Sequence, residues 1–328
     1  MSAETASPAV EAVEVTRTFG GGRTLFGGRL PGVHAVQSVS LTVEAGETLG
    51  VVGESGCGKS TLARMLVGLD RPTGGSIRLE GADVAAMARR DSNALARRVQ
   101  YVFQDPVASL NPRKTIRQIL EAPMRRLHGM AEAERAARLT ELMQVVSLRE
   151  EFLDRYPHEF SGGQAQRIGI ARALAAGARV IVLDEPVSAL DVSIQAQVLN
   201  LLDRLKRELG LTYVFISHDL SVIESVCERV AVMYFGRIVE IGRARDLYAA
   251  PRHPYTALLM RSAPAPGVRR IEAEETPAEL PDPLNPPPGC AFASRCPRAS
   301  VRCRERRPEL AGDGGHAAAC WHPLDGDD

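Results

Sequence analysis

The chain has 328 residues, of which 45% are hydrophobic and 24% are charged, and its 40 basic side chains balance 40 acidic ones. This balance gives no support for nucleic acid or an anionic membrane surface as the main partner. No apolar run is long enough to span a bilayer, and the acidic N-terminal segment lacks the basic start and apolar stretch of a signal peptide. We therefore expect a cytoplasmic chain that reaches a membrane only through a partner.

The first 70 or so residues predict two strands, and then a third strand that leads through a glycine-rich turn into a helix. Alternating polar and apolar residues at 11–19 and 33–48 predict short strands, joined by an exposed glycine-rich loop. An apolar strand at 49–52 then runs into a second glycine-rich turn and a helix that ends near residue 69. That order of strand, glycine loop and helix is typical of a phosphate-binding site.

The same alternation continues to about residue 255. Residues 105–178 have mainly helical spacing of apolar side chains. Apolar runs predict further strands at 180–183, 213–217, 229–234 and 238–241, with a helix between the first two. Strands that alternate with helices indicate an α/β domain with a mostly parallel sheet.

The turn after the strand at 49–52 is a candidate phosphate cradle. Residues 53–60 read GESGCGKS and match the pattern G-x-x-x-x-G-K-[ST] in the strand–helix context that it requires. The glycines allow backbone N–H groups to converge on phosphate oxygens, Lys59 would bridge the β- and γ-phosphates, and Ser60 would ligate Mg²⁺. The alternative is a glycine turn that only joins strand and helix. The expected ATP contacts are Gly53, Ser55, Gly56, Cys57, Gly58, Lys59, Ser60 and Thr61, with Cys57 needing no role beyond a small neutral side chain.

Two acids end the strand at 180–183, and a histidine ends the strand at 213–217. An acid at the carboxyl edge of a parallel strand, here Asp184, is well placed to hold Mg²⁺, and Glu185 can act as general base toward the attacking water. His218 would reach the γ-phosphate from the same edge. A solvated carboxylate pair and a structural histidine are the alternatives.

The segment Phe160-Ser-Gly-Gly-Gln164, followed by Gln166-Arg167, resembles the LSGGQ signature of the ABC transporter ATPases, with Phe160 in place of leucine. The resemblance covers residues 11–260. It implies a P-loop NTPase cassette over residues 1–255, with a parallel sheet core, an antiparallel β subdomain and a helical subdomain at about 105–178. The smaller cysteine-rich remainder, residues 256–328, would be an irregular C-terminal extension.

The resemblance also implies roles for residues outside the cradle. Gln104 would be the Q-loop glutamine that touches Mg²⁺ or water, Asp191 would end the D-loop, and Phe19 would stack on adenine. The signature residues would close over the γ-phosphate of a partner ATPase rather than that of their own chain; they are Ser161, Gly162, Gly163 and Gln164. Mg²⁺ would then be held by Ser60, Gln104 and Asp184.

The transported substrate is implied by resemblance alone. Residues 103–112 (FQDPVASLNP), 253–256 (HPYT) and 283–297 (PLNPPPGC, then RCP) are similar to the dipeptide and oligopeptide importer ATPases. Such a subunit lies peripherally on the cytoplasmic face of the inner membrane. Its partners are two permeases, an extracytoplasmic solute-binding protein and a second ATPase, which we expect to be a paralogue. Nickel or another small solute is the alternative cargo. A soluble ABC ATPase of DNA repair or translation, or a metal-sensing regulator, are the alternative classes of protein.

Four cysteines follow a proline-rich segment at 263–289, which predicts an extended linker. Cys290, Cys296, Cys303 and Cys320 have the spacing C-x5-C-x6-C-x16-C. Four thiolates can hold a [4Fe–4S] cluster or Zn²⁺, and free thiols or disulfides are the remaining alternatives. The family resemblance favours the cluster, as a staple for a tail too small to fold on its own. His316 could be a further ligand, but we favour a surface or packing histidine.

Overall fold

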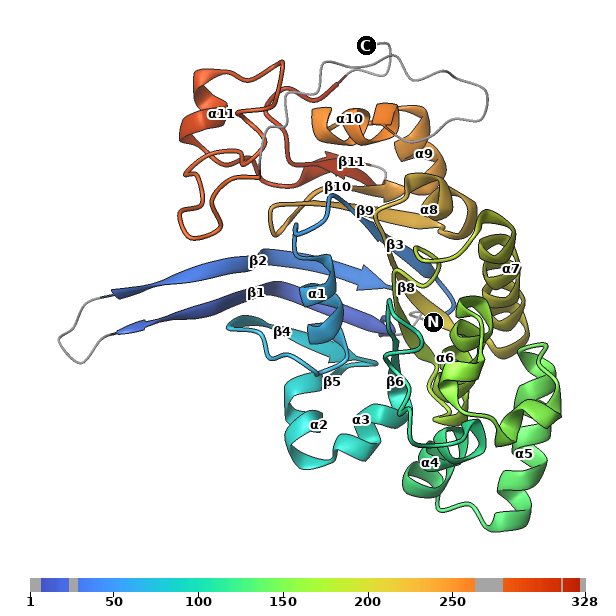
Figure 1. The fold of residues 1–328 in the computed structure, drawn as a ribbon. Coiled ribbons are helices and arrows are strands. Elements are labelled where there is room, and N and C mark those ends of the chain that lie inside the picture. Colours follow the sequence, from blue (N-terminus) through green and yellow to red (C-terminus); the bar gives the residue numbers. More distant parts are fainter. Residues whose placement is uncertain (1–6, 24–28, 263–279, 314, 325–328) are drawn as a thin grey trace, which may run out of the picture.

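The computed structural model describes residues 7–23, 29–262, 280–313 and 315–324. The chain forms two β-sheets, and helices pack against them (Figure 1). Most of the linker predicted at 263–289 lies outside the described residues, and only its end, from residue 280, is described. No helix in these described ranges is long and apolar enough to cross a membrane.

The smaller sheet is antiparallel and has the order β2-β1-β4-β5. Its strands are β1 (Val10–Arg23), β2 (Arg29–Val43), β4 (Gly74–Leu79) and β5 (Ala82–Asp83). β1 is longer than the strand predicted at 11–19, whereas β2 both begins and ends earlier than the strand predicted at 33–48. Gly20 pairs with Gly32 inside the region expected to be a loop. The hydrogen bonds between antiparallel strands join backbone groups only. A glycine-rich segment can therefore pair as strands even though its sequence shows no alternation of polar and apolar side chains. The resulting hairpin extends well beyond the rest of the molecule (Figure 1).

The larger sheet has the order β11-β12-β10-β9-β3-β8-β7-β6. The five strands from β9 to β6 in this order are parallel, whereas β10, β12 and β11 are antiparallel. The parallel strands are β3 (Thr48–Val52), β6 (Val99–Val102), β7 (Val180–Asp184), β8 (Thr212–Ser217) and β9 (Arg229–Tyr234). The mostly parallel α/β core that the sequence predicts is confirmed, with strand bounds within two residues of those expected.

Helices cover both faces of this sheet. The helices are α1 (Lys59–Leu66), α2 (Val84–Arg90), α3 (Ser92–Arg98), α4 (Ile116–His128), α5 (Glu132–Val145), α6 (Gly162–Ala175), α7 (Val192–Leu209), α8 (Leu220–Val226), α9 (Ala244–Ala249), α10 (Pro254–Ser262) and α11 (Val301–Glu305), with short 3-10 turns at Glu150–Asp154 and Pro157–Glu159. The region 105–178 is mainly helical, as predicted.

Alternate side chains of one strand enter two different hydrophobic cores. In β7, Ile181 and Leu183 pack in the core that includes the apolar faces of α6 and α7. Val180 and Val182 pack in the core that includes α1. A strand that is buried on both faces needs apolar residues at every position, which explains its uninterrupted apolar sequence.

The C-terminal extension is joined to the large sheet. β11 (Ala311–Asp313) and β12 (His316–Ala318) form a short hairpin, and β12 pairs with Glu240 and Ile241 of β10 (Arg237–Arg243). The sequence predicted an irregular extension. Three-residue strands are too short to show an alternating pattern, so these two strands could not be predicted.

Candidate nucleotide site

A cavity of about 540 Å³ opens at the carboxyl ends of the parallel strands. It is lined by most of the predicted nucleotide residues: Ser55, Gly56, Gly58, Lys59, Ser60, Thr61, Gln104, Glu185 and His218. The sequence did not predict the rest of the wall, which consists of Val33, His34, Ala35, Phe235, Gly236 and Pro283. These residues come from β2, from the β9–β10 turn and from the extension, so only the fold brings them to the cavity.

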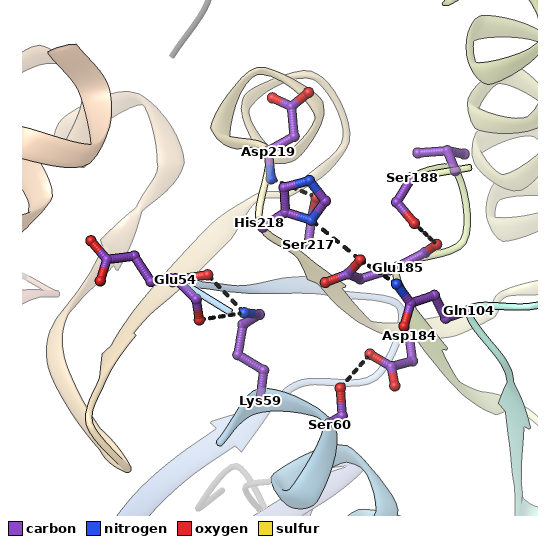
Figure 2. A network of polar contacts seen from close by, with 12 residues as sticks. Glu54, Lys59, Ser60, Gln104, Asp184, Glu185, Ser188, Ser217, His218 and Asp219 are labelled. Atoms are coloured by element: carbon purple, nitrogen blue, oxygen red, sulfur yellow. Dashed lines mark hydrogen bonds and ion pairs between the residues drawn. The ribbon is translucent and has the colours of Figure 1, made fainter. Parts of the chain in front are cut away.

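The loop before α1 has little room for side chains. A Cβ on Gly53 would lie 2.0 Å from the carbonyl oxygen of Met233, and one on Gly58 would lie 2.2 Å from that of Ala35. Gly58 also has φ 106°, which favours glycine. Lys59 is nearly buried, and its ammonium donates to the carbonyls of Gly53 at 2.7 Å and Glu54 at 3.0 Å (Figure 2). The loop therefore presents a cation and backbone N–H groups to the cavity, as anion binding requires.

Asp184 links the end of β7 to the start of α1. Its Oδ1 accepts a hydrogen bond from Ser60 Oγ at 3.1 Å, and its Oδ2 accepts one from the Tyr101 hydroxyl at 2.5 Å. Burial raises the pKa of Asp184, and these two hydrogen bonds oppose that rise. Burial and the neighbouring Asp184 carboxyl raise the pKa of Tyr101, so its hydroxyl stays protonated and donates. A serine hydroxyl and a carboxylate are hard oxygen ligands of the kind that Mg²⁺ prefers.

Glu185 lies between two other side chains of the cavity wall. Its Oε2 accepts a hydrogen bond from Gln104 Nε2 at 2.9 Å and lies 3.2 Å from His218 Nδ1 (Figure 2). Glu185 has φ 47°, a left-handed conformation that is uncommon for a residue other than glycine. Its backbone N–H donates to Ile216, and its carbonyl accepts from Ser188 Oγ, so neighbouring groups hold the strained residue in place.

Some predicted residues lie in or near the loop but outside the cavity wall. Cys57 is buried beside Gly53, and burial raises the pKa of its thiol. Phe19 is more than a third exposed and does not line the cavity; the guanidinium of Arg17 lies 4.4 Å from its ring centre. The aromatic rings that do line the cavity belong to His34 and Phe235.

The signature segment does not line this cavity. Ser161 is exposed and caps α6: its Oγ accepts from Gln164 N at 3.4 Å, and Gln164 Oε1 accepts from Ser161 N at 3.1 Å. A Cβ on Gly163 would lie 2.4 Å from the Ile194 side chain, so glycine allows α6 to start close to α7. Asp191 is exposed at the start of α7, next to Val192, which is 81% exposed. These residues form an open surface with donors at a helix N-terminus.

The four tail cysteines line one small cavity of about 10 Å³. All six cysteines of the chain are free, and burial raises the pKa of the Cys290 and Cys296 thiols and that of Cys320 to about 11. The described ranges nevertheless contain no group of three or more histidine, cysteine or acidic side chains arranged to hold a metal ion. The four tail cysteines thus lie around one small cavity as free thiols, but they do not have the arrangement of a formed metal site.

His316 does not line the cysteine cavity. Its Nε2 lies 2.7 Å from Oε1 of Glu240, a fully buried carboxyl group. That carboxyl group also accepts from the backbone N–H groups of Arg252 and His253 at the start of α10. His316 is therefore a packing histidine, in line with the interpretation favoured over a metal ligand. His322, which the sequence did not single out, lines the cavity instead.

A family model described as "ABC transporter" matches residues 36–188, and one described as "Oligopeptide/dipeptide transporter, C-terminal region" matches residues 239–303. The oligopeptide transport ATP-binding protein OppF of Salmonella typhimurium is 49% identical to the chain, over 88% of the chain and 87% of OppF. The chain belongs to the ATP-binding proteins of ABC transporters.

Other relatives of this ABC protein agree. The dipeptide transport ATP-binding protein DppF of Escherichia coli is 49% identical over 88% of the chain and 87% of its own length. The oligopeptide transport ATP-binding protein AppF of Bacillus subtilis is 47% identical over 94% of this chain and 95% of its own length. Among solved structures, a dimeric ATP-binding cassette bound to ADP and Pi in a post-hydrolysis state matches with TM-score 0.62 and 30% identity, over 72% of this chain and 99% of the cassette. The expected cassette fold and ATP-hydrolysing class are confirmed.

Proposed function

We propose that this ABC protein is the ATP-hydrolysing motor subunit of an importer for dipeptides or oligopeptides. The observation that carries the proposal is the contact between the phosphate loop and the end of β7, where Ser60 bonds Asp184 and Glu185 faces the same cavity. ATP with Mg²⁺ is the ligand that fits a cationic loop beside a carboxylate pair. The similarity to OppF and DppF supports the choice of peptides as cargo.

Each side chain of the cavity has a proposed part in hydrolysis. Lys59 and the loop N–H groups bind the β- and γ-phosphates. Ser60, Gln104 and Asp184 would hold Mg²⁺, which would neutralise phosphate charge. Glu185 Oε2 takes the proton of the attacking water as general base, while Gln104 and His218 orient its carboxylate.

The signature surface is proposed to act on another chain. Ser161, Gly162, Gly163 and Gln164 lie outside the cavity of their own chain, and Asp191 is exposed nearby. Donors at the start of α6 would close over the γ-phosphate held by a second ATPase, which we expect to be a paralogue. ATP would then join two cassettes, and hydrolysis would release them.

We further propose how the chain is divided and where it works. Residues 1–255 would act as the nucleotide-binding domain, with the helical part at 105–178 facing two permeases, and residues 256–328 as the extension. The chain would then lie peripherally on the cytoplasmic face of the inner membrane and serve an extracytoplasmic solute-binding protein. Nickel as cargo remains the second candidate, because the resemblance extends to nickel importers.

Transport by a reconstituted complex tests this function. We expect the permeases and binding protein encoded with this chain to take up labelled tripeptide only in the presence of MgATP, and peptide to raise ATP hydrolysis. Uptake of Ni²⁺ without peptide uptake would select the second candidate. ATP hydrolysis with no association to permeases would contradict the importer function.

We propose that Cys290, Cys296, Cys303 and Cys320 hold a [4Fe–4S] cluster, with Zn²⁺ as the alternative. The support is the family resemblance and the convergence of the four side chains on one cavity. Metal binding would require deprotonation of thiols whose pKa burial now raises, so the bound metal must supply the charge that stabilises the thiolates. Anaerobic purification with iron, zinc and sulfide analysis decides between them. Protein that contains none of these and folds normally would contradict both.

A further inference from the structure

The C-terminal extension touches the phosphate loop as well as the sheet. Pro283 lines the nucleotide cavity, and its carbonyl accepts the backbone N–H of His34 at 3.1 Å. A Cβ on Gly56, in the loop itself, would lie 3.8 Å from the side chain of Leu280. The extension therefore forms part of the wall around the phosphate loop rather than a distant appendage.

Glu54, in the same loop, is held by three further hydrogen bonds, two from Arg295 and one to Tyr255. The Glu54 carboxylate accepts two hydrogen bonds from the guanidinium of Arg295, both at 2.8 Å, although the two residues are 241 positions apart. The backbone N–H of Glu54 donates to the Tyr255 hydroxyl at 2.9 Å. Side chain and backbone of Glu54 are thus both held by residues beyond position 254.

The same residue supports the cradle lysine. The carbonyl of Glu54 accepts from Lys59 Nζ at 3.0 Å and from the backbone N–H of Cys57 at 3.3 Å. The orientation of the peptide group after Glu54 therefore helps to place the lysine ammonium, together with the Gly53 carbonyl. Because phosphate binding depends on the shape of this loop, a group that fixes Glu54 also fixes the site that receives ATP.

The Arg295 side chain is itself rigidly packed. It is 16% exposed, and its guanidinium lies 5.6 Å from the ring centre of Phe292 and 5.9 Å from that of Tyr234. Phe292, Tyr234 and Tyr255 form an aromatic cluster with ring centres 4.5 to 5.4 Å apart. The hydrogen bonds with Glu54 raise the pKa of Arg295, so the guanidinium remains charged. Two-point bonding by a planar, packed guanidinium restricts a carboxylate more than one flexible ammonium does.

We propose that Arg295 is a positioning residue for ATP binding: through Glu54, and together with Tyr255, it holds the phosphate loop in the form that receives the phosphates. The inference rests on the ATPase function proposed above. Arg295 directly precedes Cys296, which lines the cysteine cavity. The extension thus has a role at the nucleotide site in addition to any role of its cysteines.

The test compares steady-state ATP hydrolysis by transporters assembled with the full-length wild type, Arg295→Gln or Arg295→Lys, with the exposed Arg304→Gln in α11 as matched control. We expect Arg295→Gln to raise the KM for MgATP by about tenfold with kcat changed by less than about twofold, because loop binding energy acts on substrate and transition state alike. Arg295→Lys should raise the KM less than Arg295→Gln does but should not restore the wild-type KM, since lysine cannot donate two parallel hydrogen bonds to the carboxylate. Arg304→Gln should match the wild type.

A second set of variants keeps the test valid if Arg295→Gln folds poorly. Tyr255→Phe removes only the hydroxyl that accepts from Glu54 and should raise KM by about threefold. Glu54→Gln with Arg295→Gln should raise KM no further than Arg295→Gln alone, because both remove one interaction. KM values within twofold of the wild type in Arg295→Gln and Tyr255→Phe would overturn the inference, as would additive effects in the double variant. Absence of ATP hydrolysis by the transporter assembled with the wild-type chain would instead contradict the proposed function.

Discussion

Ser60 Oγ donates a hydrogen bond to Asp184 Oδ1 across 3.1 Å, and this contact joins positions 124 residues apart in the chain. The serine lies in the first turn of α1, and the aspartate ends β7. Neither β3 with α1, which supplies Ser60, nor β7, which supplies Asp184, could form a cation site alone. The order of strands in the sheet brings the two residues together and so creates the site.

The first prediction concerns Asp184. We expect Asp184→Asn to lower MgATP hydrolysis by roughly 100-fold, because a neutral amide is a poorer Mg²⁺ ligand than a carboxylate. Binding of ATP without Mg²⁺, measured by equilibrium dialysis, should change little. The exposed Asp203→Asn in α7 is the control. Unchanged Mg²⁺ dependence of hydrolysis in Asp184→Asn would exclude this carboxylate as a ligand.

The second prediction concerns Glu185. Glu185→Gln keeps the hydrogen-bonding shape but removes the base, so hydrolysis should fall by about 100-fold or more while ATP binding remains. ATP should then accumulate between paired cassettes, which size-exclusion chromatography with and without ATP detects. If Glu185→Gln hydrolyses ATP at the wild-type rate, another group is the base.

The third prediction distinguishes the role of the signature residues from that of the phosphate-loop cavity of the same chain. Ser161→Asp preserves the helix cap but places a negative charge where a phosphate would bind, whereas Ser161→Asn preserves the cap without charge. We expect both variants to keep the wild-type melting temperature and ATP affinity of the isolated chain. Only Ser161→Asp should lower hydrolysis of the assembled transporter by more than about tenfold. A weaker ATP affinity of the isolated Ser161→Asp chain would argue against action on a partner.

The fourth prediction concerns the adenine contact. His34 lines the cavity and Phe19 does not, so His34→Ala should weaken ATP binding by about tenfold and Phe19→Ala by less than about twofold. Fluorescence titration with a labelled ATP analogue measures both. The reverse ranking would favour Phe19, the residue that the family resemblance selects.

The fifth prediction concerns the stability of the extension. His316→Leu leaves the buried Glu240 carboxyl group without its side-chain donor, and the free energy of unfolding should fall by about 1–3 kcal/mol. His316→Gln, which retains a donor, should lose less. Chemical denaturation monitored by circular dichroism compares them. Equal stability of His316→Leu and wild type would mean that the backbone donors of Arg252 and His253 satisfy this carboxyl group alone.

Much of the fold and site could be predicted because the signals are local. The loop at 53–60, the acids after β7 and the histidine after β8 each follow a buried strand, and parallel strands bring such ends to one edge. Tyr101, His34 and Pro283 could not be predicted, because each reaches the site through pairing of distant segments. The extension of the β1–β2 hairpin through the glycine-rich segment was missed because its glycines carry no alternating pattern.

The pairing of β12 with β10 has a consequence for the order of folding. Glu240 is fully buried, and its partner His316 is made 76 residues later. During synthesis the cassette core can therefore form first, but the outer edge of its sheet stays unpaired until the tail strands leave the ribosome. The closing step joins segments far apart in sequence, so we expect it to be a slow phase of refolding, during which the exposed edge favours association between chains.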